Sequence, residues 1–237
     1  MNTKIIKKYY LIFFGISLLV TVFIYAGSLN TPFKLDDKPK IVNNPDIKKI
    51  SNIKNRLIYP YKESSDISNR NDPSRPATYL SYTINYYFGK LKPFSYNLVN
   101  LLLHLINSLF LLYFIREVLY FITGKEQKYV AFITAVLFLI HPANSINILY
   151  VYNRAGELAL LFSLFSLIMF IKYQENDGSS SFYHILSLLL YVIAIFSRQD
   201  AIVLPAILIV IDYSKNRKIK IKKHLYKEYG EEFVVDR

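Results

Sequence analysis

The sequence predicts an all-α integral membrane bundle with about six transmembrane or membrane-embedded helices and a large first extracytoplasmic loop. Of the 237 residues, 53% are hydrophobic, and they gather in membrane-length blocks separated by short polar turns. The chain has no cysteine, which excludes disulfides, thiolate catalysis and cysteine-bound zinc. Much of the net charge of +12 lies in one loop and one tail. This distribution favours membrane topology and anionic membrane lipids over nucleic acid as a partner.

The first apolar stretch covers residues 9–29 and follows three lysines, Lys4, Lys7 and Lys8. Its apolar region is too long for a signal peptide, and no clean small-x-small cleavage site follows it. We therefore predict an uncleaved anchor.

Five further apolar stretches follow the large loop. The last two are short for a span of ~20 residues, so we expect them to be tilted, broken or partly re-entrant. Pro205 is expected to end or kink the last helix. The five stretches are residues 98–122, 129–152, 155–171, 182–196 and 201–211.

Positive charge predicts the orientation of the bundle. The short segments on the side of the N-terminus are rich in Lys and Arg, whereas the short turns on the other side carry only Arg154 and Arg198. Both termini are therefore expected in the cytoplasm. The first loop, about residues 30–96, holds twelve Lys and Arg, but long loops translocate largely regardless of charge. We predict a polytopic membrane module, 1–213, and a basic cytoplasmic tail, 214–237.

Within the first loop, Tyr79, Tyr82 and Tyr86 recur at helical spacing. This pattern predicts a helix in the lipid head-group zone. The helix is either an interfacial anchor or a segment that contacts substrate.

Asp36 and Asp37 stand side by side just after the first apolar stretch. Adjacent carboxylates repel each other and compete with anionic lipid head groups, which makes them the first candidates for catalysis.

A polar stripe runs along the second apolar stretch. Asn97, Asn100, His104 and Asn107 share one helical face, which must point into the bundle or a wet cavity. The stripe either makes interhelical hydrogen bonds or lines a cavity in which Asn100 and His104 bind substrate. His104 is predicted to form hydrogen bonds rather than to bind metal, because no second histidine shares its face.

The predicted outer turns carry four more charged candidates. Arg154 and Glu157 are spaced i and i+3, so they either pair with each other or serve as a phosphate-binding cation and an active-site acid. The same two interpretations apply to Arg198 and Asp200 in the next outer turn.

Four blocks of this sequence, taken in order, resemble a known family. The chain is similar to the protein O-mannosyltransferase-like glycosyltransferases that carry tetratricopeptide repeats, within the GT-C superfamily. The blocks are 33–46 (FKLDDKPKIVNNPD), 75–107 from Arg75-Pro76 to Asn107, 141–158 with His141-Pro142 and Asn153-Arg154-Ala155-Gly156-Glu157, and 197–205 with Ser197-Arg198-Gln199-Asp200.

The resemblance implies a transferase that moves a sugar, with inversion, from a polyprenyl- or dolichyl-phosphate donor to a hydroxyl of a protein or glycan acceptor. Asp36 would be the general base, with Asp37 as its neighbour or alternate. Glu157 would join the active-site acids, and Arg154 and Arg198 would bind the donor phosphate. A divalent metal is left open, and no other cofactor is implied. The membrane would be a bacterial inner membrane or the endoplasmic reticulum, with the active face extracytoplasmic.

Two departures from the family pattern qualify this expectation. The family usually shows Ser-Lys-Glu where this chain has Ser197-Arg198-Gln199-Asp200, so the acid is displaced by one position. Family members are also longer. We therefore expect an amino-terminal module, or a protein completed by a second membrane subunit that supplies further spans. The alternative is a catalytically silent membrane protein that binds polyprenyl-phosphate lipid or scaffolds another transferase.

Overall fold

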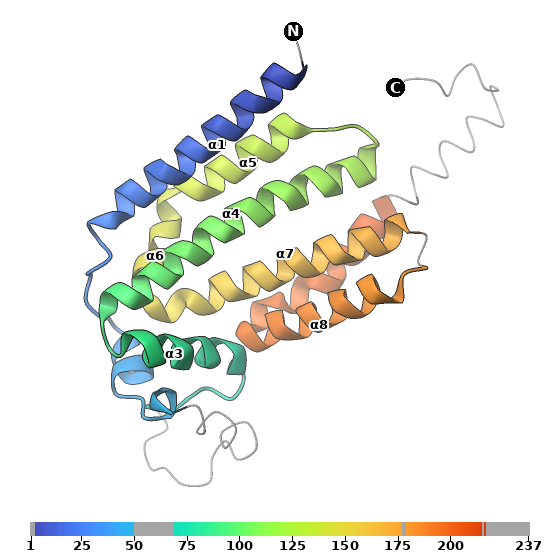
Figure 1. The fold of residues 1–237 in the computed structure, drawn as a ribbon. Coiled ribbons are helices and arrows are strands. Elements are labelled where there is room, and N and C mark those ends of the chain that lie inside the picture. The colour runs from blue at the N-terminus through green and yellow to red at the C-terminus, as the bar shows by residue number, and fades with distance from the viewer. Residues whose placement is uncertain (1–2, 50–68, 177–178, 215, 217–237) are drawn as a thin grey trace, which may run out of the picture.

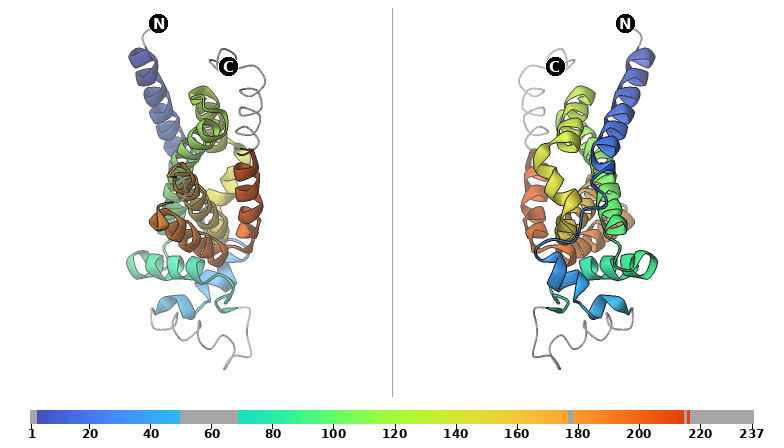
Figure 2. Two further views of the ribbon diagram at one scale, coloured as in Figure 1. Left: turned by 90° about the vertical axis from the view of Figure 1, so that its right-hand side faces the viewer. Right: turned by 90° about the vertical axis from the view of Figure 1, so that its left-hand side faces the viewer.

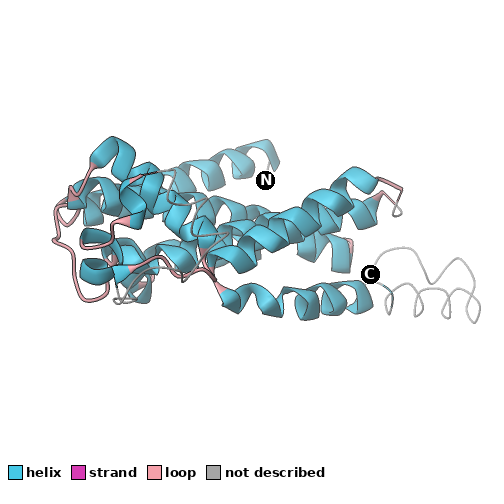
Figure 3. Cartoon of the chain, turned by 90° about the horizontal axis from the view of Figure 1, so that it is seen from below, coloured by secondary structure: helices cyan, strands magenta, loops and turns pink. Residues whose placement is uncertain are grey.

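The computed structural model describes residues 3–49, 69–176, 179–214 and 216. Throughout these ranges the chain is built of helices joined by short loops, with no β-strand (Figure 3). The predicted all-α class is confirmed. Except for residues 214 and 216, the predicted cytoplasmic tail lies outside the described residues.

Five long helices run side by side and form the bundle (Figure 1). Each corresponds to one of the predicted apolar stretches. They are α1 (Thr3–Ala26), α4 (Pro93–Thr123), α5 (Lys128–Ile140), α7 (Arg154–Glu175) and α8 (Ser181–Ser197).

A sixth element, α3 (Pro76–Gly89), lies across one end of this bundle (Figures 1 and 2). The short π-helix η1 (Lys38–Val42) and the 3-10 helix η2 (Asp46–Lys48) pack against it. The start of α1 and the end of the last described helix, 204–214, both lie at the opposite end of the bundle. The helices therefore separate the first loop from the described ends of the chain.

Two of the described helical segments are long and apolar enough to cross a membrane, Pro93–Thr123 and Val151–Glu175. A third candidate is the pair of segments Lys128–Ile140 and Pro142–Leu149, which are bent by 51° where they meet. The chain is thus a membrane protein by the length and composition of its helices. The total of six membrane segments stays a prediction.

The third apolar stretch is not one helix as predicted, because His141-Pro142 interrupts it. His141 takes an extended conformation, which is favoured before proline. The chain continues as η4 (Pro142–Asn144), α6 (Ser145–Leu149) and η5 (Val151–Asn153). At the break, the Asn144 side chain donates to the Phe138 carbonyl at 2.6 Å and so replaces a lost helical bond.

The expectation that Pro205 ends or kinks the last helix is also wrong. After η6 (Gln199–Val203), the chain is α-helical over 204–214, so Pro205 stands in the first turn of that helix. A proline is tolerated there because the first N–H groups of a helix have no intrahelical acceptor.

The tyrosines of α3 were expected to face the lipid head groups, but two of them face the protein interior. Tyr79 and Tyr82 are buried against η1, η2 and α4, so these two rings are not on the exposed face of the helix. The Tyr82 hydroxyl donates to the carbonyls of Val151 and Tyr152, at 3.1 Å each. The exposed face of α3 instead carries aliphatic and other aromatic side chains.

Polar groups join the helices inside the bundle. Asn97 of α4 donates to the carbonyls of Leu29 and Thr31, which anchors the end of the first segment. Ser166 of α7 and Ser187 of α8 each donate to the other's backbone carbonyl at 2.9 Å. Such exchanges between small residues allow helices to approach closely within a membrane.

We predict that Gly89→Ala destabilises the corner between α3 and α4. A Cβ at Gly89 would lie 2.5 Å from the Ser95 Cβ and even closer to its hydroxyl. The expected loss is about 1–3 kcal/mol of unfolding free energy, as for other overpacked sites. Thermal unfolding in detergent measures it. Gly15→Ala is the control, since nothing lies within 4 Å of its added Cβ. Equal unfolding temperatures for the two variants would contradict the tight corner.

Candidate active site

The structure separates the two adjacent acids of the first loop into different environments. Asp37 is buried, with 1% of its surface exposed, whereas Asp36 is exposed. Both lie at the end of the bundle where α3 crosses it. Because of this difference in burial, only one of the two carboxylates is accessible to a group that approaches from outside.

Asp37 anchors the loop. Its two carboxylate oxygens accept hydrogen bonds from the backbone N–H of Lys34, at 3.0 Å, and of Tyr152, at 2.7 Å. Burial raises the pKa of the Asp37 carboxyl above its ordinary value; these amide bonds oppose the rise, and the charge of Asp36 adds to it. Asp37 therefore joins the first loop to η5, and its oxygens are already occupied.

Asp36 is the accessible carboxylate of the pair. Its Oδ2 accepts a hydrogen bond of 2.6 Å from the Tyr150 hydroxyl. Burial, and then the bond to Asp36, raise the pKa of the Tyr150 hydroxyl, so it remains a proton donor at neutral pH. The Asp36 Oδ1 has no hydrogen-bond partner among the described residues. Asp36 can therefore accept a proton from a group that approaches from outside.

Arg154, predicted to pair with Glu157 or to bind phosphate, is instead enclosed at the first turn of α7. Its side chain is 0% exposed, and the acceptors that it has among the described residues are all uncharged. The rings of Tyr82 and Tyr96 cover its guanidinium, with centroids at 5.0 and 5.5 Å. The acceptors are Asn100 Oδ1 at 2.7 Å, Asn85 Oδ1 at 2.8 Å, the Tyr96 carbonyl at 3.1 Å and the Ser81 carbonyl at 3.4 Å.

Glu157 pairs across to α4 rather than along its own helix. Its carboxylate lies 3.2 Å from His104 Nδ1 and accepts a hydrogen bond from the Asn107 side chain. His104 Nε2 lies 3.1 Å from the Leu139 carbonyl of α5. Glu157 and Asp36 share no hydrogen-bond partner within the described ranges. Glu157 is thus buried in the interior of the bundle and bound to α4, whereas Asp36 is exposed.

The polar stripe of α4 is engaged in interhelical contacts, which was one of its two predicted roles. All four of its side chains are buried. Asn100, besides accepting from Arg154, donates to the carbonyls of Asn147, at 3.2 Å, and Tyr150, at 3.4 Å. In this arrangement Asn100 and His104 join α4 to neighbouring segments of the bundle. A substrate-binding role for them stays a prediction.

Arg154 and Arg198 were both candidates for binding the donor phosphate, and Arg198 is the one that is half-exposed. Its Nε lies 2.8 Å from the Asp200 carboxylate, and its Nη1 donates to Asn153 Oδ1 at 3.4 Å. Gly156 leaves room for the guanidinium, since a Cβ there would lie 3.1 Å from Nη1. Arg198 and Asp200 thus form an exposed ion pair beside the start of α7.

Two residues of this end had no predicted role. Arg75 lies with its guanidinium 5.9 Å from the centre of the Tyr152 ring, and Tyr150 holds Asp36. Tyr150 stands inside an apolar stretch, where an aromatic ring is expected in a membrane helix. Its neighbours in the sequence do not indicate that its hydroxyl binds a carboxylate. Arg75 begins one of the four blocks of the resemblance, but its sequence context gives no sign of a contact with Tyr152.

In the part of the chain that the structure describes, no three His, Asp or Glu side chains are grouped so as to hold a metal ion. The use of a divalent metal therefore stays untested.

The fold and this end of the bundle define a helical membrane protein with an exposed, hydrogen-bonded carboxylate in its first loop. Curated relatives make the class more specific. The chain is 29% identical to mouse protein O-mannosyl-transferase TMTC4 over 90% of its own length, and 29% identical to mouse protein O-mannosyl-transferase TMTC1 over 79%. It is 30% identical to human protein O-mannosyl-transferase TMTC3 over 65%.

These similarities confirm the resemblance to the protein O-mannosyltransferase-like family. The chain spans only 31%, 20% and 16% of the length of those three relatives, respectively. No protein-family profile matches the chain. No solved structure matches it either.

We predict that Arg154→Met strongly destabilises the protein. The substitution leaves the Asn85 and Asn100 oxygens and the Tyr96 carbonyl buried without donors, at a cost of about 1–3 kcal/mol for each unpaired group. Thermal unfolding in detergent, together with the yield of monodisperse protein, reports the loss.

The matched control is Arg116→Met, which removes a partly exposed pair with Glu117 near the other end of α4. It should change stability by no more than about 1 kcal/mol. If Arg154→Met unfolds at the temperature of this control, the guanidinium does not hold the three helices together.

Proposed function

We propose that this chain is the membrane module of a glycosyltransferase that moves a sugar, mannose by analogy with its relatives, from a lipid-phosphate donor to a protein hydroxyl. The relatives, which are all named protein O-mannosyl-transferases, support the reaction class. The observation that carries the proposal is the exposed Asp36 carboxylate, oriented by Tyr150 at one end of a membrane bundle.

In the proposed reaction, Asp36 is the general base. A serine or threonine hydroxyl of the acceptor would place its proton within hydrogen-bond reach of the free Oδ1. As that proton moves to Asp36, the hydroxyl oxygen bonds to the anomeric carbon from the face opposite the phosphate. As this bond forms, the bond between the anomeric carbon and the phosphate oxygen breaks, and the lipid phosphate leaves with the electron pair of that bond. Attack from the opposite face inverts the configuration of the sugar.

Asp37 supports this role without sharing it. Its bonds to the Lys34 and Tyr152 amides hold the loop so that the neighbouring residue points outward. We therefore assign Asp37 to positioning and Asp36 to proton transfer.

Arg198 is our candidate for the donor phosphate. Its half-exposed guanidinium could exchange the weakly held Asn153 oxygen and the exposed Asp200 carboxylate for phosphate oxygens. Arg154 is a weaker candidate than the sequence pattern indicates, since its Nε, Nη1 and Nη2 atoms already donate inside the bundle. The phosphate would then bind on the same face of the bundle as Asp36.

We expect Asp36→Asn to abolish transfer while leaving the protein folded. Asparagine can accept the Tyr150 bond but cannot take up the acceptor proton. The measurement is incorporation of labelled mannose into a serine- and threonine-containing peptide, in membranes supplied with lipid-phosphate mannose. The unfolding temperature should remain close to that of the parent protein.

Asp37→Asn should instead lower the free energy of unfolding by about 1–3 kcal/mol, because it loses the hydrogen bond from the Lys34 amide.

Glu117→Gln serves as the control for this experiment, since Glu117 lies near the other end of α4 and pairs with Arg116. Unchanged transfer by Asp36→Asn would remove Asp36 as the base. If the parent chain transfers nothing yet binds lipid phosphate, the alternative of a silent lipid-binding module is favoured instead.

A further inference from the structure

The outward face of α3 is apolar from residue 80 to residue 88. Leu80, Ile84, Tyr87 and Phe88 follow one another at helical spacing and expose 42%, 48%, 65% and 82% of their surfaces. The opposite face of the same helix is occupied by Tyr79, Tyr82 and Asn85. A helix with one apolar face exposed and the other packed against protein is typical of a segment lying in a membrane interface.

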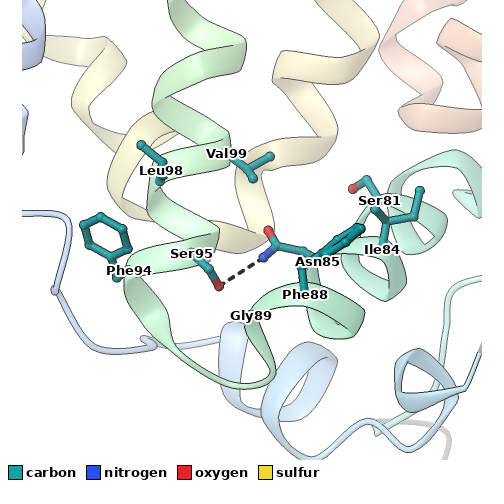
Figure 4. Close-up of a pocket in the computed structure, with 9 residues that line it drawn as sticks. All are labelled: Ser81, Ile84, Asn85, Phe88, Gly89, Phe94, Ser95, Leu98 and Val99. Carbon is teal, nitrogen blue, oxygen red and sulfur yellow. Dashed lines mark hydrogen bonds between the residues drawn. The ribbon is translucent and has the colours of Figure 1, made fainter.

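A hollow of about 410 Å³ opens where the end of α3 meets the start of α4 (Figure 4). Asn85 and Ser95 lie in it, and they bond to each other at 3.1 Å, so their polar atoms are largely satisfied. The remaining wall is mostly hydrocarbon. Its apolar side chains come from both helices and are Ile84, Phe88, Phe94, Leu98 and Val99.

The position of the hollow indicates what fills it. α4 is one of the two clearest membrane-spanning helices, and only three residues, 90–92, separate it from α3. The hollow is therefore at the level where α4 enters the bilayer. Lys90 and Lys92 flank this corner, and lysines at an interface favour the phosphate groups of lipids.

We propose that α3 lies in the membrane interface and that the hollow between α3 and α4 binds one acyl chain of a membrane phospholipid. The apolar wall covers the chain, and the outward face of α3 contacts neighbouring lipid. Asn85, whose oxygen accepts from Arg154, forms part of the floor, so the lipid rests directly on the residues that hold the helices together. The proposal is independent of sugar transfer, and failure of that reaction would leave it standing.

The first experiment uses tryptophan as a reporter, because the chain contains none. Tyr87→Trp and Phe88→Trp are reconstituted into phosphatidylcholine bilayers with and without brominated acyl chains. We expect blue-shifted emission that brominated chains quench. Lys48→Trp is the control, since Lys48 is exposed on η2, on the side of α3 away from the bundle (Figure 1). Water-like emission without quenching at both α3 positions would overturn the interfacial placement.

The second experiment tests the hollow itself. Val99→Phe, which fills the hollow, is combined with the Phe88→Trp reporter, and Leu102→Phe is the matched control. Leu102 stands on α4 with 47% of its surface exposed and does not line the hollow. Quenching by brominated chains should weaken with Val99→Phe and stay unchanged with Leu102→Phe. Equal quenching in both would show that lipid surrounds α3 without entering the hollow, and would overturn this part of the proposal.

Discussion

The guanidinium of Arg154 is the constraint on which the described end of the bundle beside α3 depends. A buried guanidinium stays charged and must be given acceptors, because its removal from water costs several kcal/mol. Here those acceptors are oxygens of Asn85 on α3 and of Asn100 and Tyr96 on α4. One side chain of α7 therefore sets the positions of two other helices. The uncharged acceptors leave the net charge of the group unneutralised, and the two tyrosine rings over it offset part of that cost.

The position of the exposed acid follows from this arrangement in a few contacts. Once α3 is held, the Tyr82 hydroxyl fixes the backbone carbonyls of Val151 and Tyr152. The Tyr152 amide then binds Asp37, which leaves Asp36 on the outside beside Tyr150. Two chemically identical neighbours thus acquire different roles through burial. A residue far from the carboxylate can therefore affect it by moving α3.

Hydrophobic blocks and helical spacing predicted the helices and the buried stripe of α4, because both signals are local. Partners were harder to predict. Arg154 and Glu157 have the spacing of an ion pair, but each binds residues of other segments that lie about fifty positions away. The inward face of α3 was also misjudged, since both of its faces carry aromatic residues and a membrane removes the usual contrast between inside and outside. Tyr150 carried no local signal, because its role appears only when the first loop meets η5.

The contacts of Arg154 have a consequence for the order in which the protein is made. Its four acceptor residues, from Ser81 to Asn100, all precede it in the chain. A ribosome therefore completes α3 and α4 before the arginine leaves the exit tunnel. The acceptor oxygens of α3 and α4 are therefore already made when the charged side chain reaches the bilayer. A circular permutation that placed α7 ahead of α3 would retain the contacts of the finished fold but would expose the arginine to lipid during synthesis.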